Sequence, residues 1–301
     1  MSPAGRPARP LRSWMFVPGN RQRFLDKIYE LETPPDVAFF DLEDGVLPDG
    51  KAEARELVGE VLRRAAPGPL RTVRINAVNT DWFEEDMASI LGPGLEAVCV
   101  PKVESTAGLD PVVELLDRED PDGEVRIIAA IESAAAVLGA REIAAAHPRV
   151  LAIMFGTEDY ALDLGLSTRR EGEAAELIYA RSAIVLAAAA ARVLSIDGVF
   201  PDLDDPDGLH ADILQSRQLG FSGKSTFNPR QVELINERFS PTQDELLYAA
   251  RVADGFAQAR ARGDASVAVG GQLVDLPIVE RAHSLLDLAK QLGLEIPAVG
   301  A

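Results

Sequence analysis

Short apolar runs alternate along the chain with longer stretches rich in Ala, Leu, Glu and Arg. Eight of the runs have the length and the Val, Ile and Phe content of buried strands, at 14–17, 37–40, 72–75, 97–100, 126–131, 151–155, 198–200 and 224–227. Eight parallel strands joined by helices close a (β/α)8 TIM barrel, so we expect this α/β fold. An open doubly wound sheet shows the same alternation, and the residues at the strand ends must separate the two.

The stretches between the runs predict helices at 51–64, 106–116, 134–146 and 173–193. Two further helical stretches, near 244–262 and 276–291, lie beyond the eighth run, and a glycine-bearing β-like segment, 263–275, separates them. We therefore expect a catalytic barrel domain over residues 11–240 and a C-terminal helical extension over 241–301. The segment 263–275 is a candidate lid.

Composition and charge narrow the class of partner. The chain has 301 residues, and its 47% hydrophobic and 26% charged content is that of a soluble protein with a sizeable core. Against 48 Asp and Glu there are 30 Lys and Arg, and the net charge of −18 repels nucleic acid and anionic membranes at long range. We expect neither among the partners, and a polyanionic ligand would need a local basic cluster.

Cysteine usage and the start of the chain indicate a compartment. Cys99 is the single cysteine and lies in an apolar run, so no intrachain disulfide can form. The first ten residues lack the apolar core of a signal peptide, and no later run reaches the roughly 18 apolar residues of a membrane span. These features predict a soluble cytoplasmic protein.

Charged side chains follow several of the predicted strands. Asp41 and Glu43 follow the second, Arg74 the third, Glu132 the fifth and Asp159 the sixth. In a β/α barrel the reacting groups lie where strands finish, because the loops at that face converge on one mouth. Glu132 and Asp159, from adjacent strands, could share one hard divalent cation such as Mg²⁺ and leave positions for water and substrate oxygens.

Arg74, Glu132 and Asp159 each also have a purely structural interpretation. Glu132 beside Ser133 would suit the first turn of a helix, and Asp159 could be a loop acid. Arg74 could simply pair with a neighbouring acid. No Cys or His cluster accompanies the two carboxylates, which argues against zinc, since the histidines are scattered at His147, His210 and His283.

Two weaker signals concern ligand binding. Gly156 follows the sixth strand and could let backbone N–H groups approach a ligand oxygen, although such a glycine often only makes a turn. Arg21, Arg23 and Lys27 form a small basic cluster in a very acidic chain. This cluster is a candidate phosphate site beside an ordinary turn composition.

Seven short motifs stand in a fixed order along the chain. They are Phe16-Val17-Pro18-Gly19-Asn20-Arg21, Asp41-Leu42-Glu43-Asp44-Gly45-Val46, Val73-Arg74-Ile75-Asn76, Pro101-Lys102-Val103-Glu104, Ile131-Glu132-Ser133, Phe155-Gly156-Thr157-Glu158-Asp159 and Gly271-Gln272-Leu273-Val274-Asp275. Over roughly residues 11–293 this order resembles the citrate lyase β-subunit family, with its malyl-CoA and citramalyl-CoA lyase relatives in the HpcH/HpaI aldolase superfamily. An ordered set is far more specific than any one motif.

The resemblance implies a β/α barrel with Mg²⁺ bound by Glu132 and Asp159. Arg74 would grip the carboxylate of a 2-oxo acid and take part in catalysis. Glu132, Gly156 and Thr157 would contact the substrate, with Glu132 also serving catalysis. The chain would form a homo-oligomer, a trimer or a hexamer.

The same resemblance implies roles outside the metal site. Asp275 would be brought over the barrel mouth of a neighbouring subunit to act as acid or base. Arg21, Arg23 and Lys27 would face the phosphates of coenzyme A, which carries the substrate as a thioester. Mg²⁺ and this carrier are the only cofactors implied.

One motif departs from the family pattern. Near the eighth strand the family usually shows Gly-Lys followed by an Ile-His-Pro-like segment, whereas Phe227-Asn228-Pro229 stands here. A carboxamide replaces an imidazole, and Asn228 cannot titrate near neutral pH. A proton-handling role at this position is therefore in doubt.

The resemblance favours an Mg²⁺-dependent carbon-carbon lyase that cleaves or forms a 3-hydroxyacyl-CoA, such as malyl-CoA, citramalyl-CoA or citryl-CoA. The products would be acetyl-CoA, or a related acyl-CoA, and a 2-oxo acid. Three alternatives stay open: a citrate lyase subunit acting on an acyl carrier protein thioester, a malyl-CoA thioesterase, and a pyruvate-dependent class II aldolase on the same fold.

Overall fold

The computed structural model describes residues 9–64, 67–167 and 174–299. By its internal contacts the chain divides into two units. Of the described residues, those within 11–237 form the first unit, and 238–299 form the second together with residues 9 and 10. None of the helices in the described part of the chain combines the length and the apolar composition that a membrane crossing requires.

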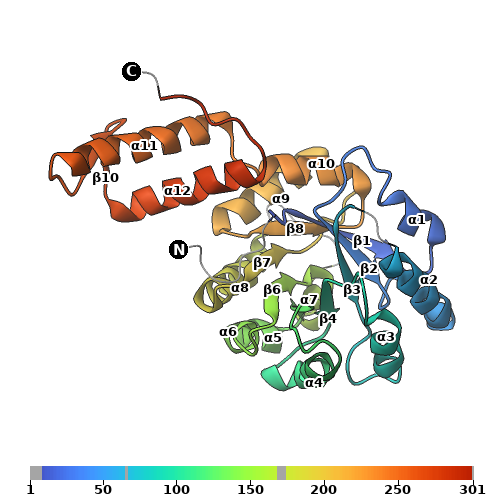
Figure 1. Ribbon diagram of the computed structural model, residues 1–301. Helices are drawn as coiled ribbons and strands as arrows, with labels where there is room; N and C mark the ends of the chain where they lie inside the picture. Colours follow the sequence, from blue (N-terminus) through green and yellow to red (C-terminus); the bar gives the residue numbers. More distant parts are fainter. Residues whose placement is uncertain (1–8, 65–66, 168–173, 300–301) are drawn as a thin grey trace. The chain divides into compact units, whose positions relative to one another are not determined.

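The first unit is a closed barrel of eight strands, surrounded by helices (Figure 1). The strands are β1 (Ser13–Pro18), β2 (Val37–Asp41), β3 (Leu70–Arg74), β4 (Ala97–Val100), β5 (Arg126–Ile131), β6 (Val150–Phe155), β7 (Leu194–Asp197) and β8 (Gly223–Thr226). Each strand pairs in parallel with the next, and β1 pairs with β8 to close the ring. The expected (β/α)8 TIM barrel is therefore confirmed, and the open sheet is excluded.

Helices connect the strands, as the alternation predicts. They are α1 (Gln22–Lys27), η1 (Pro48–Gly50), α2 (Lys51–Arg63), α3 (Phe83–Ile90), η2 (Thr106–Gly108), α4 (Asp110–Glu119), α5 (Ala134–Leu138), α6 (Ala140–Ala144), α7 (Thr157–Asp163), η3 (Ala175–Leu177), α8 (Ile178–Ala191), α9 (Pro206–Leu219) and α10 (Pro229–Arg238). The single helices expected at 106–116 and 134–146 are each divided, the second at Gly139. Glu173, the expected start of the helix at 173–193, lies outside the described residues.

The prediction of the seventh strand at 198–200 is wrong, because β7 is Leu194–Asp197. Asp197 at its end is fully buried, and an aspartate is rarely fully buried unless it is paired. Two buried cations compensate it: Arg181 donates from Nε and Nη2 at 3.1 and 2.9 Å, and Lys224 Nζ donates at 2.9 Å. Asp212 contacts Lys224 Nζ at 2.6 Å and Arg181 Nη2 at 2.6 Å, so two acids balance two bases.

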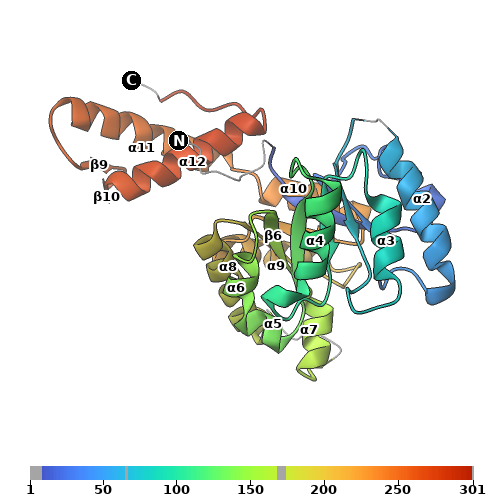
Figure 2. The same cartoon turned by 60° about the horizontal axis from the view of Figure 1, so that its bottom comes forward.

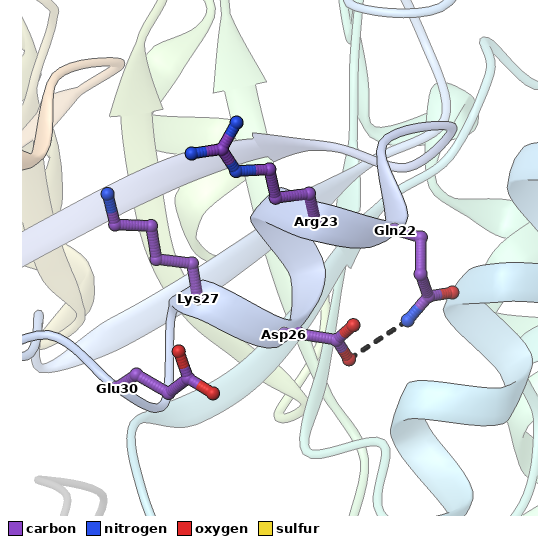
Figure 3. Close-up of a pocket in the computed structure, with 5 residues that line it drawn as sticks. All are labelled: Gln22, Arg23, Asp26, Lys27 and Glu30. Carbon is purple, nitrogen blue, oxygen red and sulfur yellow. Dashed lines mark hydrogen bonds between the residues drawn. The ribbon is translucent and has the colours of Figure 1, made fainter.

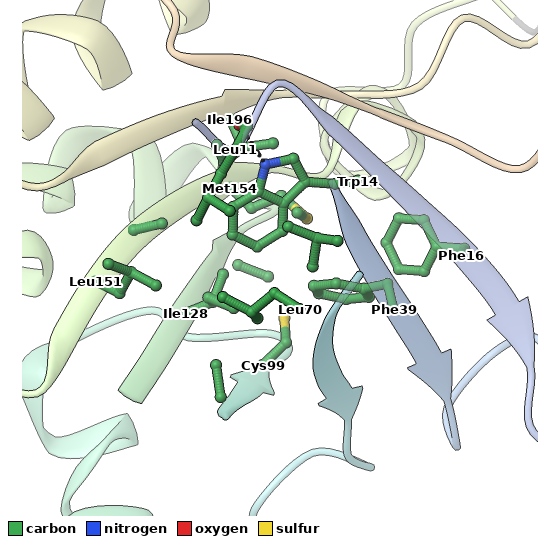
Figure 4. Packing of buried hydrophobic residues seen from close by; sticks show 14 of the residues in the cluster. Leu11, Trp14, Phe16, Phe39, Leu70, Cys99, Ile128, Leu151, Met154 and Ile196 are labelled. Carbon is green, nitrogen blue, oxygen red and sulfur yellow. Dashed lines mark hydrogen bonds between the residues drawn. The ribbon is translucent and has the colours of Figure 1, made fainter. Parts of the chain in front are cut away.

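Apolar side chains that point inward fill the barrel (Figure 4). Trp14, Phe16 and Phe39 form a chain of rings, with centroids 6.0 Å apart for Trp14 and Phe39 and 4.5 Å apart for Phe16 and Phe39. The indole N–H of Trp14 donates to the carbonyl of Leu11 at 2.9 Å, which satisfies its polar atom inside the core. The barrel interior is therefore a packed core, and a ligand must bind at one of its ends.

The second unit holds two long helices and a hairpin: α11 (Gln243–Ala261), β9 (Val267–Val269), β10 (Gln272–Val274) and α12 (Leu276–Gln291). Figure 2 shows α11 and α12 side by side. The predicted β-like segment is an antiparallel pair joined at Gly270 and Gly271, with φ 57° and 82°. Both values lie in the left-handed region that a two-residue hairpin turn requires.

Candidate active site

One pocket collects most of the predicted site residues. It is lined by Arg74 at the end of β3, by Glu132 directly after β5, and by Gly156, Thr157 and Asp159 after β6. All of these positions lie at the carboxyl ends of the strands, where barrel enzymes carry their active sites. Arg21, Arg23 and Lys27 do not line this pocket.

Arg74 is buried and already holds two carboxylates. Its Nε and Nη2 donate to the two carboxylate oxygens of Asp41 at 2.8 and 2.7 Å, and its Nη1 lies 2.9 Å from Glu43 Oε2. Asp41 is held in turn by the backbone N–H groups of Glu43 and Gly45. The acids keep the guanidinium charged and fix its plane, with the ring of Phe16 4.8 Å from Cζ.

Lys102, which follows β4, joins three carboxylates. Its φ of 55° lies in the left-handed region, which is unusual for a residue with a Cβ. In this conformation its backbone N–H donates to Glu132 Oε2 at 2.9 Å, while Nζ lies 2.9 Å from Glu43 Oε1 and 3.8 Å from Asp44 Oδ2. The sequence shows Lys102 and Glu43 after strands but gives no sign of these contacts.

Glu132 is a buried carboxylate under electrostatic strain. Burial, together with the negative charges of Glu43 and Asp159, raises the pKa of Glu132 to about 7 from 4.5, against the opposing effect of Arg74. A divalent cation between Glu132 and Asp159 would relieve this repulsion. The two carboxylates therefore fit a hard cation.

Gly156 leaves room for Glu132. A Cβ built on Gly156 would lie 2.3 Å from Glu132 Cγ and 2.7 Å from its Oε1, so any side chain here would displace the carboxylate. The N–H of Gly156 donates to Ile131 O at 3.0 Å, so the expectation that this N–H binds a ligand oxygen is wrong. Gly156 contributes to the site by leaving space for Glu132. Helix α7 begins at Thr157, which places Thr157 and Asp159 in its first turn beside Glu132.

The donor set suits a metal that keeps open positions. Among the described residues, no group of three or more His, Cys, Asp and Glu side chains is arranged as a metal site. Glu132 and Asp159 would supply two oxygens, and water and substrate would complete the coordination that Mg²⁺ prefers. The binding of Mg²⁺ by Glu132 and Asp159 therefore stays a prediction.

Lys51, the first residue of α2, supports the loop that carries Glu43. Its Nζ donates to the carbonyls of Leu42 and Glu43 at 2.7 and 2.8 Å and to Asn76 Oδ1 at 2.6 Å. Asn76 donates to Asp86 at 2.7 Å. A Lys at the start of a helix gives no signal of this role in the sequence, because the contact depends on how the barrel closes.

Asn228 has a structural role in place of the family's histidine. Its Oδ1 accepts from the N–H of Arg230 at 3.1 Å, and its own N–H donates to Thr226 Oγ1 at 3.0 Å. Pro229 begins α10, so Asn228 caps this helix. The side chain serves the backbone, which agrees with the doubt about proton handling.

The basic cluster lies at α1, with Arg21 at the N-cap and Arg23 and Lys27 within the helix. Figure 3 shows Arg23 and Lys27 extending from the same side of the helix, where they line an open depression with Gln22, Asp26 and Glu30. Gln22 Nε2 donates to Asp26 Oδ1 at 2.9 Å, and Asp26 also pairs with Arg64. Arg21, Arg23 and Lys27 are all exposed and accessible to an anion.

Asp275 belongs to the second unit, at the N-cap position of α12. Its backbone carbonyl accepts from Ile278 and Val279, but its side chain makes no capping hydrogen bond. The residue is exposed. Its carboxylate is therefore not engaged in capping the helix.

Comparison with known proteins identifies a family and several relatives of this chain. Residues 12–229 match the family model described as HpcH/HpaI aldolase/citrate lyase. The citrate lyase subunit beta of Leuconostoc mesenteroides subsp. cremoris is 37% identical over 284 residues, covering 92% of this chain and 93% of that protein. The (3S)-malyl-CoA thioesterase of Cereibacter sphaeroides is 36% identical over 280 residues, covering 92% and 94%.

A solved structure agrees over nearly the whole chain. The protein CitE of Mycobacterium tuberculosis, in complex with magnesium, acetoacetate and coenzyme A, superposes with a TM-score of 0.77 at 30% identity, covering 94% of this chain and 100% of that one. The barrel, the ordered motifs and the family model all agree. The chain therefore belongs to the HpcH/HpaI aldolase/citrate lyase family and is a lyase.

Proposed function

We propose that this lyase is an Mg²⁺-dependent carbon-carbon lyase that reversibly cleaves a 3-hydroxyacyl-CoA to an acyl-CoA and a 2-oxo acid. The observation that supports this most directly is the pocket in which Arg74, Glu132 and Asp159 meet at the carboxyl end of the barrel. A cation for the substrate carboxylate lies beside two carboxylates suited to a metal. The magnesium and coenzyme A in the Mycobacterium tuberculosis structure support the same choice of cofactors.

Glu132 and Asp159 would hold Mg²⁺, which when bound polarises the carbonyl of the 2-oxo acid. Arg74, which is held by Asp41 and Glu43, would orient the carboxylate of the 2-oxo acid through those of its N–H groups that are not bound to Asp41. The backbone N–H of Lys102 keeps Glu132 Oε2 in place, and the absent Cβ of Gly156 keeps the space for the rest of its carboxylate.

In the condensing direction a base removes a proton from the methyl group of acetyl-CoA. The resulting carbanion attacks the carbonyl carbon of the 2-oxo acid. The former carbonyl oxygen then takes up a proton and becomes the 3-hydroxyl. We assign the acid-base role to Asp275 of a neighbouring subunit in a homo-oligomer. Its exposed carboxylate, which caps nothing, follows the β9–β10 hairpin and supports this role.

Arg21, Arg23 and Lys27 would bind the phosphates of coenzyme A. Their exposure and the common side shared by Arg23 and Lys27 support this in a chain with a net charge of −18. The local positive charge would offset the long-range repulsion of the polyanion.

Hydrolysis of the thioester is the second candidate function. It is favoured by the likeness to the malyl-CoA thioesterase of Cereibacter sphaeroides, which is as extensive as the likeness to a citrate lyase subunit. A subunit acting on an acyl carrier protein thioester would be inactive with free CoA thioesters. The products and the carrier distinguish these outcomes.

The test is a screen of malyl-CoA, citramalyl-CoA and citryl-CoA with Mg²⁺ and with a chelator. A lyase releases a 2-oxo acid and an acyl-CoA, whereas a thioesterase releases free CoA and the hydroxy acid. We expect Asp159→Ala to abolish the Mg²⁺-dependent turnover. Asp163→Asn, on the same helix α7 but outside the pocket, should keep it. Full activity of chelator-treated Asp159→Ala protein would refute the metal assignment.

A further inference from the structure

The floor of the active-site pocket is apolar. Cys99 of β4, Ala130 of β5 and Met154 of β6 line it, and all three also belong to the packed core of the barrel. Figure 4 shows Cys99 and Met154 within this core. Ser225 is a polar lining residue from β8, and its Oγ donates to Asp197 O at 3.0 Å. A substrate group that points toward the floor therefore meets carbon and sulfur atoms.

The pocket lining has one cation. Arg74 is the only Lys, Arg or His among the residues that line it, against the three acids Glu132, Glu158 and Asp159. Arg74 donates two of its five N–H groups to Asp41, and its Nη1 also lies 2.9 Å from Glu43 Oε2 in an ion pair. The N–H groups that remain can bind at most one further carboxylate in a planar fork. A second substrate carboxylate would meet either the apolar floor or the acids, and both are unfavourable.

Phe227 stands beside Arg74 at the mouth. Its ring centroid lies 5.0 Å from that of Phe16, which covers one face of Arg74. Phe227 is 57% exposed and follows β8 directly. Hydrogen bonds of Thr226 and Asn228 fix the backbone on either side of it. Phe227 is thus held as an apolar wall next to the place where the 2-oxo acid carboxylate would bind.

We propose that the pocket selects a 2-oxo monocarboxylic acid that carries hydrogen or a small alkyl group on its carbonyl carbon, and that Phe227 sets this preference. The proposal rests on the proposed lyase function. The open side of the pocket must admit the thioester, so the substituent of the 2-oxo acid is directed to the apolar walls. A dicarboxylic 2-oxo acid places its second charge against those walls.

The test compares glyoxylate, pyruvate, 2-oxobutanoate and oxaloacetate as partners of acetyl-CoA in the presence of Mg²⁺, with kcat/KM measured for each. We expect oxaloacetate to be at least tenfold poorer than the best monocarboxylic acid. Phe227→Arg supplies a second cation and should raise kcat/KM for oxaloacetate relative to pyruvate at least tenfold. Phe227→Ala should favour 2-oxobutanoate over glyoxylate relative to the unchanged enzyme.

Leu203→Arg is the matched control, because Leu203 is 55% exposed but does not line the pocket. Its substrate ratios should not change. Oxaloacetate as the best acceptor of the unchanged enzyme, or ratios unaffected by both Phe227 variants, would overturn the proposal. Calorimetric titration of the protein with pyruvate and with oxaloacetate in MgCl₂ tests the selectivity of the pocket separately from the lyase function. If no acid condenses, the lyase function fails, while the order of the two affinities still decides the selectivity of the pocket.

Discussion

Arg74 grips Asp41 with one edge of its guanidinium, Nε to Oδ1 at 2.8 Å and Nη2 to Oδ2 at 2.7 Å. The direction of the remaining N–H groups is therefore set by a second residue that does not itself line the pocket. Because Asp41 fixes the plane of the guanidinium, it would also determine the orientation of a substrate carboxylate that Arg74 binds. Both the charge and the planar fork matter for this arrangement.

Arg74→Lys keeps the charge but loses the fork. We expect kcat/KM to fall by about tenfold or more, or about 1.4 kcal/mol, for every active substrate. Arg12 makes the same fork with Asp36, at 2.8 and 2.9 Å, beside the opposite ends of β1 and β2. Arg12→Lys is thus the control and should leave steady-state kinetics unchanged. Wild-type kinetics in Arg74→Lys would show that the fork is not used on the substrate.

The raised pKa of Glu132 predicts how stability depends on pH without metal. Since the folded pKa is about 7 and the ordinary value is 4.5, the folded state retains a proton that the unfolded state releases. The free energy of unfolding should therefore fall as pH rises from about 4.5 to 7, by on the order of 3 kcal/mol. Urea titrations of chelator-treated protein across this range measure the fall.

Two comparisons identify the cause of that fall. Glu132→Gln cannot ionise and should lose this component of the pH dependence. Mg²⁺ binds the ionised form, so its stabilising effect should grow with pH over the same range. An identical pH profile for Glu132→Gln would mean that the titration arises elsewhere.

Lys102 offers a separation of backbone and side-chain effects. Lys102→Gly keeps the N–H that donates to Glu132 and suits the left-handed φ, but it removes the ammonium beside Glu43. Lys102→Ala removes the ammonium and keeps the unfavourable backbone. We expect the Gly variant to be more stable than the Ala variant by about 0.5–1 kcal/mol, measured by chemical denaturation.

The activity of both Lys102 variants should fall together if the ammonium positions Glu43. Arg192 provides the control, because it is exposed, has φ 61° and ends α8 away from the pocket. Arg192→Gly should change stability alone. If Lys102→Gly is as active as the unchanged enzyme, the ammonium has no positioning role.

Asp275→Asn tests the acid-base assignment. Asn cannot serve as a base, and the Asp275 side chain makes no capping bond to lose. We expect kcat to fall by roughly 10²- to 10⁴-fold with the melting temperature almost unchanged. Thr242 is the opposite case, since its side chain does cap α11. Thr242→Ala should lower stability by about 1 kcal/mol with kcat preserved.

A mixing experiment tests whether the acid-base group crosses a subunit boundary. Asp275→Asn and Asp159→Ala chains, each inactive, should recover part of the activity when they exchange in one oligomer. Demonstrated mixed oligomers without recovery would contradict the shared site. An unimpaired Asp275→Asn enzyme would remove the acid-base role altogether.

The sequence predicts the barrel and the ends of its strands well, for a local reason. Apolar runs that are followed by Arg74, Glu132 or Asp159 mark both a strand and the face on which it ends, so the order of residue types is enough to predict these three lining residues. It gives no signal for lining residues such as Ser225 and Phe227. The position of β7 is not predicted correctly, because Asp197 is a charged residue buried within the fold and interrupts the apolar pattern. Only Arg181 and Lys224, distant in sequence, make its burial tolerable.

The interactions that orient the site residues could not be predicted. The fork between Arg74 and Asp41 depends on the register of β2 and β3, which pairs these two positions. The left-handed backbone of Lys102 has no sequence signal, because a lysine rarely adopts it. Residue types thus mark the site, while the tertiary structure decides which acid holds which cation.

The buried group of Arg181, Asp197, Asp212 and Lys224 also constrains how this chain can diverge. Removing any one member leaves a charge without its partner in the protein interior, which costs about 3–5 kcal/mol, a large part of the stability of a domain. A single substitution at any of the four positions therefore cannot be neutral for stability. Among descendants of this chain, the four positions should covary, either staying charged together or turning apolar in opposite-charge pairs.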